Sequence, residues 1–434
     1  MLFAYFNLCS EDNTSESLAN ILSRMKDKDI GITLQTMNLR QLFLQHNAQT
    51  SETPLCFEVS RAEGSYLYDQ DGHPFIDLIG GISVCHVGHG NQKVKDAIKT
   101  QVDQYLHVMV YGEVIQSPQV LFAEALSRHL PETLDAIYFT NSGSEATEGA
   151  MKLAKRITGR QNMISFKNSY HGSTQGALSV MGSEYWQQAF RPLIPGIRQF
   201  NYGSEDAIDA INHETACIIL EPVQSEAGVI LPDNKWLQAI QTRCRETGTL
   251  LILDEIQTAF GRTGSLFRFE QCGIVPDVLL LGKALGAGMP MGAFITSKDK
   301  MDQLAKDPVL GHITTFGGHP VCCAAGLAGL QYLNESRLIQ DVSKKEALFH
   351  RELSATGLKL NSCGLLMALH FDDYVQNKKV IDACLNKKQF ATGVFTDWFL
   401  FAANALRIAP PLSIQEEEIK EACSVIREAI RTVI

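Results

Sequence analysis

The sequence lacks the marks of several protein classes. Its 38 basic residues form no run and no aromatic stripe, and the formal net charge is −10, so we expect no nucleic-acid partner. It contains no membrane-spanning apolar stretch, and its start has neither the basic residues nor the cleavage site of a signal peptide, so we expect no membrane contact. The 11 cysteines form no CxxC pair, which favours reduced thiols and a cytoplasmic location.

Signatures for metals and nucleotides are also missing. The neighbouring histidines His86 and His89, and likewise His312 and His319, have no carboxylate at a spacing that would complete a metal site, so we predict none. No G-x-x-x-x-G-K-[ST] motif occurs, and no G-x-G-x-x-G follows a first predicted strand. A nucleotide-dependent oxidoreductase, which shares the alternation of strands and helices described next, is therefore a disfavoured alternative.

Short apolar runs alternate with helical patterns through the middle of the chain. The runs are AIYFT, NMISF, ACIILEP, TLLILDE, DVLLLGK and MGAFITS, and the segment 232–247 is typical of a covering helix. Strands that are apolar on both faces indicate a mainly parallel sheet between helices, so the predicted fold class is α/β. Polar or glycine-rich stretches follow these runs, and such a sheet binds ligands at the carboxyl ends of its strands.

The pattern predicts a large domain and a smaller one. Residues 86–325 carry the sheet pattern and form the predicted cofactor-binding domain. Residues 38–85, with a hairpin about Asp71-Gly72, and residues 326–434, with two short strands and a last helix from Glu416, form the predicted smaller α+β domain. Residues 1–37 carry no recognisable chemistry and are treated as a disordered extension.

Two charged residues end neighbouring predicted strands. Asp254 follows the apolar run TLLIL without a basic residue nearby, so its carboxylate needs a charged partner, for which a protonated pyridine nitrogen is suitable. Lys283 ends the next strand beside glycines, where an amine that is partly desolvated is suited to forming a Schiff base. Taken alone, the acidic residue would be better explained as a helix N-cap or a structural ion pair, and the alternative for Lys283 is a surface lysine.

A third segment, TNSGSEATEGAMKLAKRITGR, runs from a strand end into a helix. The free amides at the helix start, together with Gly143 and the Ser144 hydroxyl, are typical of a phosphate site, although serine also caps ordinary helices. A phosphate cradle, a partner for a pyridinium and a Schiff-base lysine together describe one cofactor, pyridoxal 5′-phosphate.

The chain resembles the class-III, fold-type-I aminotransferases, the group of the ornithine, acetylornithine and 4-aminobutyrate aminotransferases. The resemblance extends from about residue 38 to the end and rests on TNSGSEATEGAMKLA, YHGST, EPVQSEAG, LILDEIQTAFGRTG, LLGKALGAGMPMGAF, TTFGGHPVCCAA and LRIAPPL. It implies an aminotransferase that moves an amino group from an amine or amino acid, by preference an ω-amine, to a 2-oxo acid such as 2-oxoglutarate or pyruvate. An aminomutase or a racemase on the same scaffold is the alternative.

The resemblance also assigns roles to residues. Lys283 and Asp254 are implied to be catalytic, Tyr170 to stack on the cofactor ring, and Gln257 to contact its phenolic oxygen. Gly143 and Ser144 are implied to hold the phosphate. Thr315 is implied to reach the phosphate of the other subunit, which would make a homodimer with shared active sites. Glu226 and Arg407 match the pair that selects substrates in the family.

The chain departs from the family pattern at two motifs. Ser173 stands where many members have the arginine of YHGRT, which commonly binds a substrate carboxylate. Gly90, Asn91 and Gln92 stand where many have the end of GHxHP. The first departure predicts a donor unlike ornithine or 4-aminobutyrate.

Overall fold

The computed structural model describes residues 38–433, so the predicted extension at 1–37 lies outside the described residues. The described residues divide into two units between Glu58 and Val59. In the described part of the first unit, helix α2 (Leu39–His46) begins at Asn38. The Asn38 and Gln41 side chains each accept a hydrogen bond from the other's backbone amide, so that two amides without a helical acceptor are satisfied.

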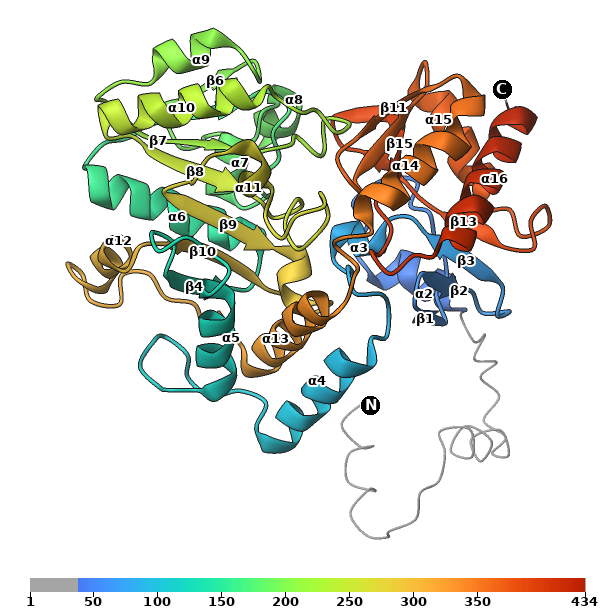
Figure 1. Ribbon diagram of the computed structural model, residues 1–434, viewed down its shortest axis with the longest axis horizontal. Coiled ribbons are helices and arrows are strands. Elements are labelled where there is room, and N and C mark those ends of the chain that lie inside the picture. Colours follow the sequence, from blue (N-terminus) through green and yellow to red (C-terminus); the bar gives the residue numbers. More distant parts are fainter. Residues whose placement is uncertain (1–37, 434) are drawn as a thin grey trace. The chain divides into compact units, whose positions relative to one another are not determined.

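A seven-stranded sheet forms the centre of the second unit (Figure 1). Its order is β4-β10-β9-β8-β7-β5-β6. The strands are β4 (Ala136–Thr140), β5 (Asn162–Phe166), β6 (Ile197–Phe200), β7 (Thr215–Leu220), β8 (Leu250–Asp254), β9 (Val278–Gly282) and β10 (Gly292–Thr296). All neighbours are parallel except that β10 is antiparallel to β4 and β9. The mainly parallel sheet is confirmed, but the prediction that MGAFITS belongs to the parallel set was wrong.

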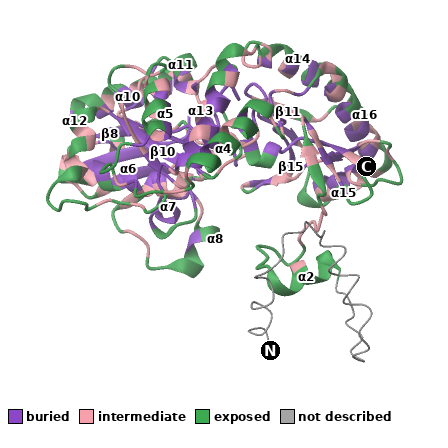
Figure 2. Ribbon diagram, turned by 90° about the horizontal axis from the view of Figure 1, so that it is seen from below, coloured by how far each residue is buried: buried purple, intermediate pink, exposed green. Residues whose placement is uncertain are grey.

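Alternate side chains of each central strand belong to different apolar cores. In β8, Leu251 and Leu253 pack in the core that contains Trp236 of helix α10 (Asn234–Thr247). Leu250 and Ile252 pack in the core that contains Met151 of helix α6 (Gly143–Thr158). The sheet is therefore covered on both faces, as the purple strands in Figure 2 show. The covering helices are α4 (Gln92–Gln104), α5 (Ser117–Ser127), α6 (Gly143–Thr158), α10 (Asn234–Thr247) and α13 (Pro320–Glu335).

Two four-stranded sheets lie outside the central sheet. The first contains β1 (Arg61–Glu63), β2 (Tyr66–Tyr68), β3 (Pro74–Asp77) and β13 (Gly393–Phe395). The pairing of β2 with β3 confirms the predicted hairpin, and the parallel pairing of β13 with β3 joins the two ends of the unit. The second contains β11 (Lys359–Ser362), β12 (Met367–His370), β14 (Trp398–Phe399) and β15 (Ala402–Ile408).

Shorter helices and the last helix complete the unit. They are α3 (Gly80–Ser83), α7 (Gln175–Val180), α8 (Glu184–Gln187), α9 (Glu205–Ala210), α11 (Arg268–Cys272), α12 (Lys298–Met301), α14 (Val342–Leu353), α15 (Tyr374–Cys384) and α16 (Glu416–Val433). Among the described residues, no helix is long and apolar enough to cross a membrane. The domain boundaries near residues 85 and 325 stay predictions.

Candidate active site

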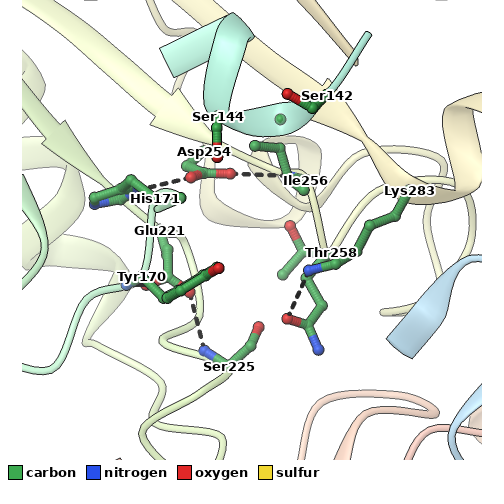
Figure 3. Close-up of a pocket in the computed structure, with 13 residues that line it drawn as sticks. Ser142, Ser144, Tyr170, His171, Glu221, Ser225, Asp254, Ile256, Thr258 and Lys283 are labelled. Carbon is green, nitrogen blue, oxygen red and sulfur yellow. Dashed lines mark hydrogen bonds and ion pairs between the residues drawn. The ribbon is translucent and has the colours of Figure 1, made fainter. Parts of the chain in front are cut away.

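A cavity of about 190 Å³ opens where the central parallel strands end (Figure 3). Its walls include six of the residues predicted from the sequence: Gly143, Ser144, Tyr170, Asp254, Gln257 and Lys283. The walls also include residues to which the sequence assigned no role, among them Ser142, His171, Glu221, Ser225, Ile256 and Thr258. Segments from β4, β5, β7, β8 and β9 meet here because parallel strands bring their carboxyl ends to one edge of the sheet.

Asp254, the last residue of β8, presents a carboxylate with 4% exposure to the cavity. Its Oδ2 lies 2.7 Å from Nδ1 of His171, and its Oδ1 accepts the backbone amide of Ile256 at 3.0 Å. Figure 3 shows the carboxylate between these two partners. The contacts fix the direction of the carboxylate.

The neighbouring Glu255 has a different role. Its carboxylate accepts the amides of Arg268 at 2.6 Å and Phe269 at 2.7 Å, at the start of α11. Burial raises the pKa of Glu255 to about 7, and the backbone hydrogen bonds oppose that shift. Glu255 lies one residue beyond β8 and its carboxylate is bound at the start of α11, so only the first of the two acidic residues lines the cavity.

Lys283 begins a short 3-10 helix, η2 (Lys283–Gly286), directly after β9. Its φ of 48° lies in the left-handed region. This backbone conformation is unfavourable for residues other than glycine, and residues that adopt it occur often at functional sites. Its Nζ donates to Oε1 of Gln257 at 3.2 Å. Burial lowers the pKa of the Lys283 amine, although the carboxylates of Glu226 and Asp254 oppose the shift, so more of the amine is uncharged and nucleophilic.

The start of α6 forms one wall of the cavity. The Ser142 hydroxyl caps the helix by accepting the amide of Glu145 at 3.2 Å, and the amides of Gly143 and Ser144 belong to the first turn, which has no acceptors within the helix. A Cβ on Gly143 would meet the Ile256 side chain at 2.7 Å. Backbone amides and the helix dipole favour an anion at this wall.

Glu221 supports a second wall from β7. It accepts the amide of Tyr170 at 3.1 Å and the amide of Ser225 at 3.1 Å. Burial raises the pKa of Glu221 to about 7. Both Glu221 and Glu226 belong to the motif EPVQSEAG, but a role was predicted from the sequence only for Glu226.

Glu226 and Arg407 form a buried ion pair. Nη1 of Arg407 lies 2.9 Å from Oε1 of Glu226, and Nη2 lies 3.0 Å from Oε2. The Glu226 and Arg407 side chains are 5% and 3% exposed. Glu226 is the next residue in the chain after Ser225, which lines the cavity. Burial alone would raise the pKa of Glu226, but the Arg407 guanidinium holds it below its usual value, so the pair is ionic.

Thr315 is exposed and does not line the cavity that contains the other predicted cofactor contacts. Its neighbour Thr314 lines a different hollow together with Tyr138. Ser173 lies near the cavity, where its hydroxyl is 3.1 Å from that of Tyr170 and its amide donates to Ser144 Oγ at 3.2 Å.

Comparison with known proteins identifies the family. The family model "Aminotransferase class-III" matches residues 47–430. The chain belongs to this family. It is 34% identical over 402 residues to an acetylornithine aminotransferase of Methanopyrus kandleri, which covers 91% of this chain and 99% of that one. An acetylornithine aminotransferase of Bacillus subtilis is 35% identical over 382 residues, which cover 86% of this chain and 94% of that one.

Solved structures agree. The ornithine aminotransferase of Toxoplasma gondii superposes with a TM-score of 0.84 at 26% identity over 96% of this chain and 98% of that one. An adenosylmethionine-8-amino-7-oxononanoate aminotransferase of Methanocaldococcus jannaschii gives a TM-score of 0.82 at 28% identity over 90% and 98%. The chain is a fold-type-I aminotransferase that depends on pyridoxal phosphate, and the oxidoreductase alternative was rightly disfavoured.

The cavity residues fit this cofactor. Asp254 is a buried carboxylate with a fixed direction, and Nε2 of Gln257 and Nε2 of His171 are buried without a partner among the described residues. A Cβ on Gly172 would lie 2.0 Å from the Ser144 hydroxyl oxygen, so this wall admits only glycine. The start of α6 would bind the anionic group of the cofactor, Asp254 would pair with its protonated ring nitrogen, and Lys283 would react with its carbonyl group.

Proposed function

We propose that this aminotransferase takes nitrogen from an amine or amino acid donor, by preference an ω-amine, and gives it to a 2-oxo acid such as 2-oxoglutarate or pyruvate. The observation that carries the proposal is the buried pair of Arg407 and Glu226 next to the cavity of Lys283. Arginine binds a carboxylate through two parallel hydrogen bonds, the arrangement that Glu226 now occupies.

The cavity residues divide the work of binding and proton transfer. Bound pyridoxal phosphate supplies an aldehyde that condenses with amines and a ring that takes up the electrons of a broken C–H bond. Lys283 would hold the cofactor at rest and would later carry the proton to and from the substrate carbon, and Asp254 would keep the ring nitrogen protonated. Tyr170 would stack on the ring, Gln257 would contact its phenolic oxygen, and Gly143, Ser144 and Thr315 would hold the phosphate.

The ion pair selects between two kinds of substrate. A 2-oxo acid brings a carboxylate, which takes the Arg407 edge while Glu226 moves away. An ω-amine brings none to that position, and Glu226 then stays on Arg407 and keeps the buried charge neutralised. The same cavity therefore serves both half-reactions.

The donor lacks one family anchor. With Ser173 in place of an arginine, a distal carboxylate on the donor has no cation at that position. We therefore expect a donor unlike ornithine or 4-aminobutyrate, and the names of the relatives add acetylornithine to the donors to be tested.

We further infer a homodimer in a reducing, cytoplasmic environment. The exposed position of Thr315, away from the cavity, supports a phosphate contact across a subunit interface. The ten cysteines of the described residues are free thiols, which fits such an environment.

Half-reaction kinetics with ion-pair variants test the proposal. Arg407→Ala is expected to raise the KM for the 2-oxo acid by a factor that corresponds to about 2 to 5 kcal/mol, and Arg407→Lys to restore little of it, because lysine lacks the planar donor pair. Glu226→Ala is expected to favour α-amino donors over ω-amines. Equal losses with donor and acceptor in both variants, together with a lower melting temperature, would instead indicate a structural pair.

A further inference from the structure

Three consecutive residues hold the Arg407 guanidinium on the sides that Glu226 leaves free. Oδ1 of Asp397 accepts Nε at 2.7 Å, and the carbonyl oxygen of Trp398 accepts Nη2 at 3.0 Å. The Phe399 ring lies under the guanidinium, with its centroid 4.3 Å from Cζ. Charge-assisted hydrogen bonds and an aromatic face each favour one orientation of a planar cation.

Glu226 occupies the remaining edge, formed by Nη1 and Nη2. Among the described residues, its carboxylate accepts one further hydrogen bond, from the amide of Leu400 at 3.1 Å. The guanidinium therefore has one exchangeable partner on the edge suited to a carboxylate, and other partners on its remaining sides.

Hydrogen bonds to the backbone of Arg407 also hold the segment 396–399 beside this residue. The Arg407 amide donates to the Asp397 carbonyl oxygen at 2.9 Å, and the Thr396 hydroxyl donates to the Arg407 carbonyl oxygen at 2.6 Å. Thr396 and Asp397 directly precede β14, which pairs antiparallel with β15, the strand of Arg407, and the register of this pair shifts between Trp398 and Phe399. This register shift lies within residues 397–399, which direct the Asp397 side chain, the Trp398 carbonyl group and the Phe399 ring toward the Arg407 guanidinium.

We propose that Asp397 is a positioning residue that fixes Arg407 through Nε, so that the edge formed by Nη1 and Nη2 stays presented when Glu226 leaves. This inference rests on the proposed role of Arg407 as the carboxylate anchor. It makes Glu226 the moving member of the pair and Arg407 the stationary one. The ordering of the arginine is then complete before the 2-oxo acid arrives, which lowers the entropic cost of binding.

A second effect of Asp397 has the opposite sign. Its negative charge repels an incoming carboxylate, so if charge dominated, removal of Asp397 would tighten carboxylate binding. Orientation and charge can be separated, because asparagine keeps an oxygen that accepts the Nε proton but carries no charge, whereas alanine keeps neither.

The test compares Asp397→Ala with Asp397→Asn in the cofactor-loaded enzyme. The measurements are KM and kcat for 2-oxoglutarate and the Kd of succinate, a carboxylate that cannot transaminate, from titration of the visible absorbance. We expect Asp397→Ala to raise both KM and Kd about tenfold with little change in kcat, and Asp397→Asn to stay within about threefold of the parent. Asp372→Ala is the matched control, since this exposed aspartate contacts Gln376 and not Arg407.

Three outcomes overturn the inference: parent-like values for Asp397→Ala, tighter binding in both variants, or an asparagine variant as impaired as the alanine variant. Should Asp397→Ala fail to fold, Asp397→Ser takes its place, because its hydroxyl is too short to replace the carboxylate at Nε. Arg407→Ala is measured in parallel. A normal KM there contradicts the anchor role itself, whereas a raised KM there beside a normal Asp397→Ala contradicts only the role of Asp397.

Discussion

Burial determines the chemistry of single side chains in the cavity. Lys283 is the amine whose pKa burial lowers, and Asp254 is a carboxylate with 4% exposure that a histidine and a backbone amide orient. Partial desolvation makes an amine more nucleophilic at neutral pH, and a fixed carboxylate needs no reorganisation during a reaction.

Replacement of Lys283 is the first prediction. Lys283→Ala should fold normally, because within the described part of the chain the lysine side chain donates a single hydrogen bond, to Gln257. Turnover should nevertheless fall by several orders of magnitude, since the nucleophile and the proton carrier are lost together. The measurements are steady-state turnover and the melting temperature. Borohydride should fix cofactor to the parent but not to the variant, and near-normal turnover would refute the assignment.

Asp254→Asn should separate cofactor binding from reaction. The amide keeps an oxygen for the His171 contact but cannot stabilise a protonated ring nitrogen, so the single-turnover rate should fall on the order of a hundredfold or more. The phosphate wall at the start of α6 should still retain the cofactor, which absorbance of the dialysed protein measures. If the variant retains cofactor and reacts at the parental rate, Asp254 is not the partner of the ring.

At the scale of elements, local patterns were predictable and distant contacts were not. The apolar runs that end at Asp254 and Lys283 predicted buried strands with charged residues at their ends, and both residues line the cavity. The role of His171 could not be predicted, because its partner lies 83 residues further along the chain. The direction of β10 could not be predicted either, since an apolar strand is equally apolar in both directions.

Helix α3 is a left-handed turn, with φ of 56° at Gly80, 64° at Gly81 and 61° at Ile82. A β-branched residue in this region costs about 1–2 kcal/mol. Ile82→Gly should therefore destabilise the protein less than Ile230→Gly, and the difference should be about 1–2 kcal/mol. Ile230 is the matched control because it is 37% exposed, against 41% for Ile82, and has no positive φ. Urea unfolding of both variants measures the difference, and equal losses would show that the turn stores no strain.

The same turn is anchored by an ion pair that depends on pH. Asp77 accepts the amides of Ile79 and Gly80 at Oδ1, and its Oδ2 lies 2.7 Å from Nε2 of His89. Burial lowers the pKa of His89, but hydrogen bonds to Asp77 and Cys85 outweigh this effect and raise it to about 10.

Because the folded pKa of His89 lies above the usual 6.5, the pair contributes fully below about pH 6.5, and its contribution is lost as pH rises toward 10. The free energy of unfolding of the parent should exceed that of His89→Asn by on the order of 1–3 kcal/mol at pH 6, with the difference shrinking by pH 9.5. Urea titrations at several pH values measure it, with His129→Asn, an exposed histidine, as control. A difference that is constant with pH would show that folding does not raise the pKa of His89.

At the scale of the whole molecule, the cavity of one chain holds all but one of the predicted cofactor contacts. Thr315 lies on the exposed segment that also carries Ile313 and Phe316, whose side chains are apolar and exposed. Exposed apolar groups beside a residue that is proposed to contact the phosphate are typical of an interface between two copies of the chain.

Subunit mixing tests this composite site. Thr315→Glu should be inactive, because it sets a negative charge against the phosphate of the neighbouring chain, and Lys283→Ala should be inactive through its own cavity. In a heterodimer of the two, one site carries both lesions and the other carries none. Random exchange of equal amounts gives half heterodimers with one intact site of two, so about a quarter of the parental activity should return. The matched control is Lys283→Ala mixed with Asp254→Ala, where each lesion stays in its own chain's cavity and no site is intact. Recovery in the control as well, or none in the test mixture once exchange has been shown by mass, would mean that Thr315 does not act across subunits.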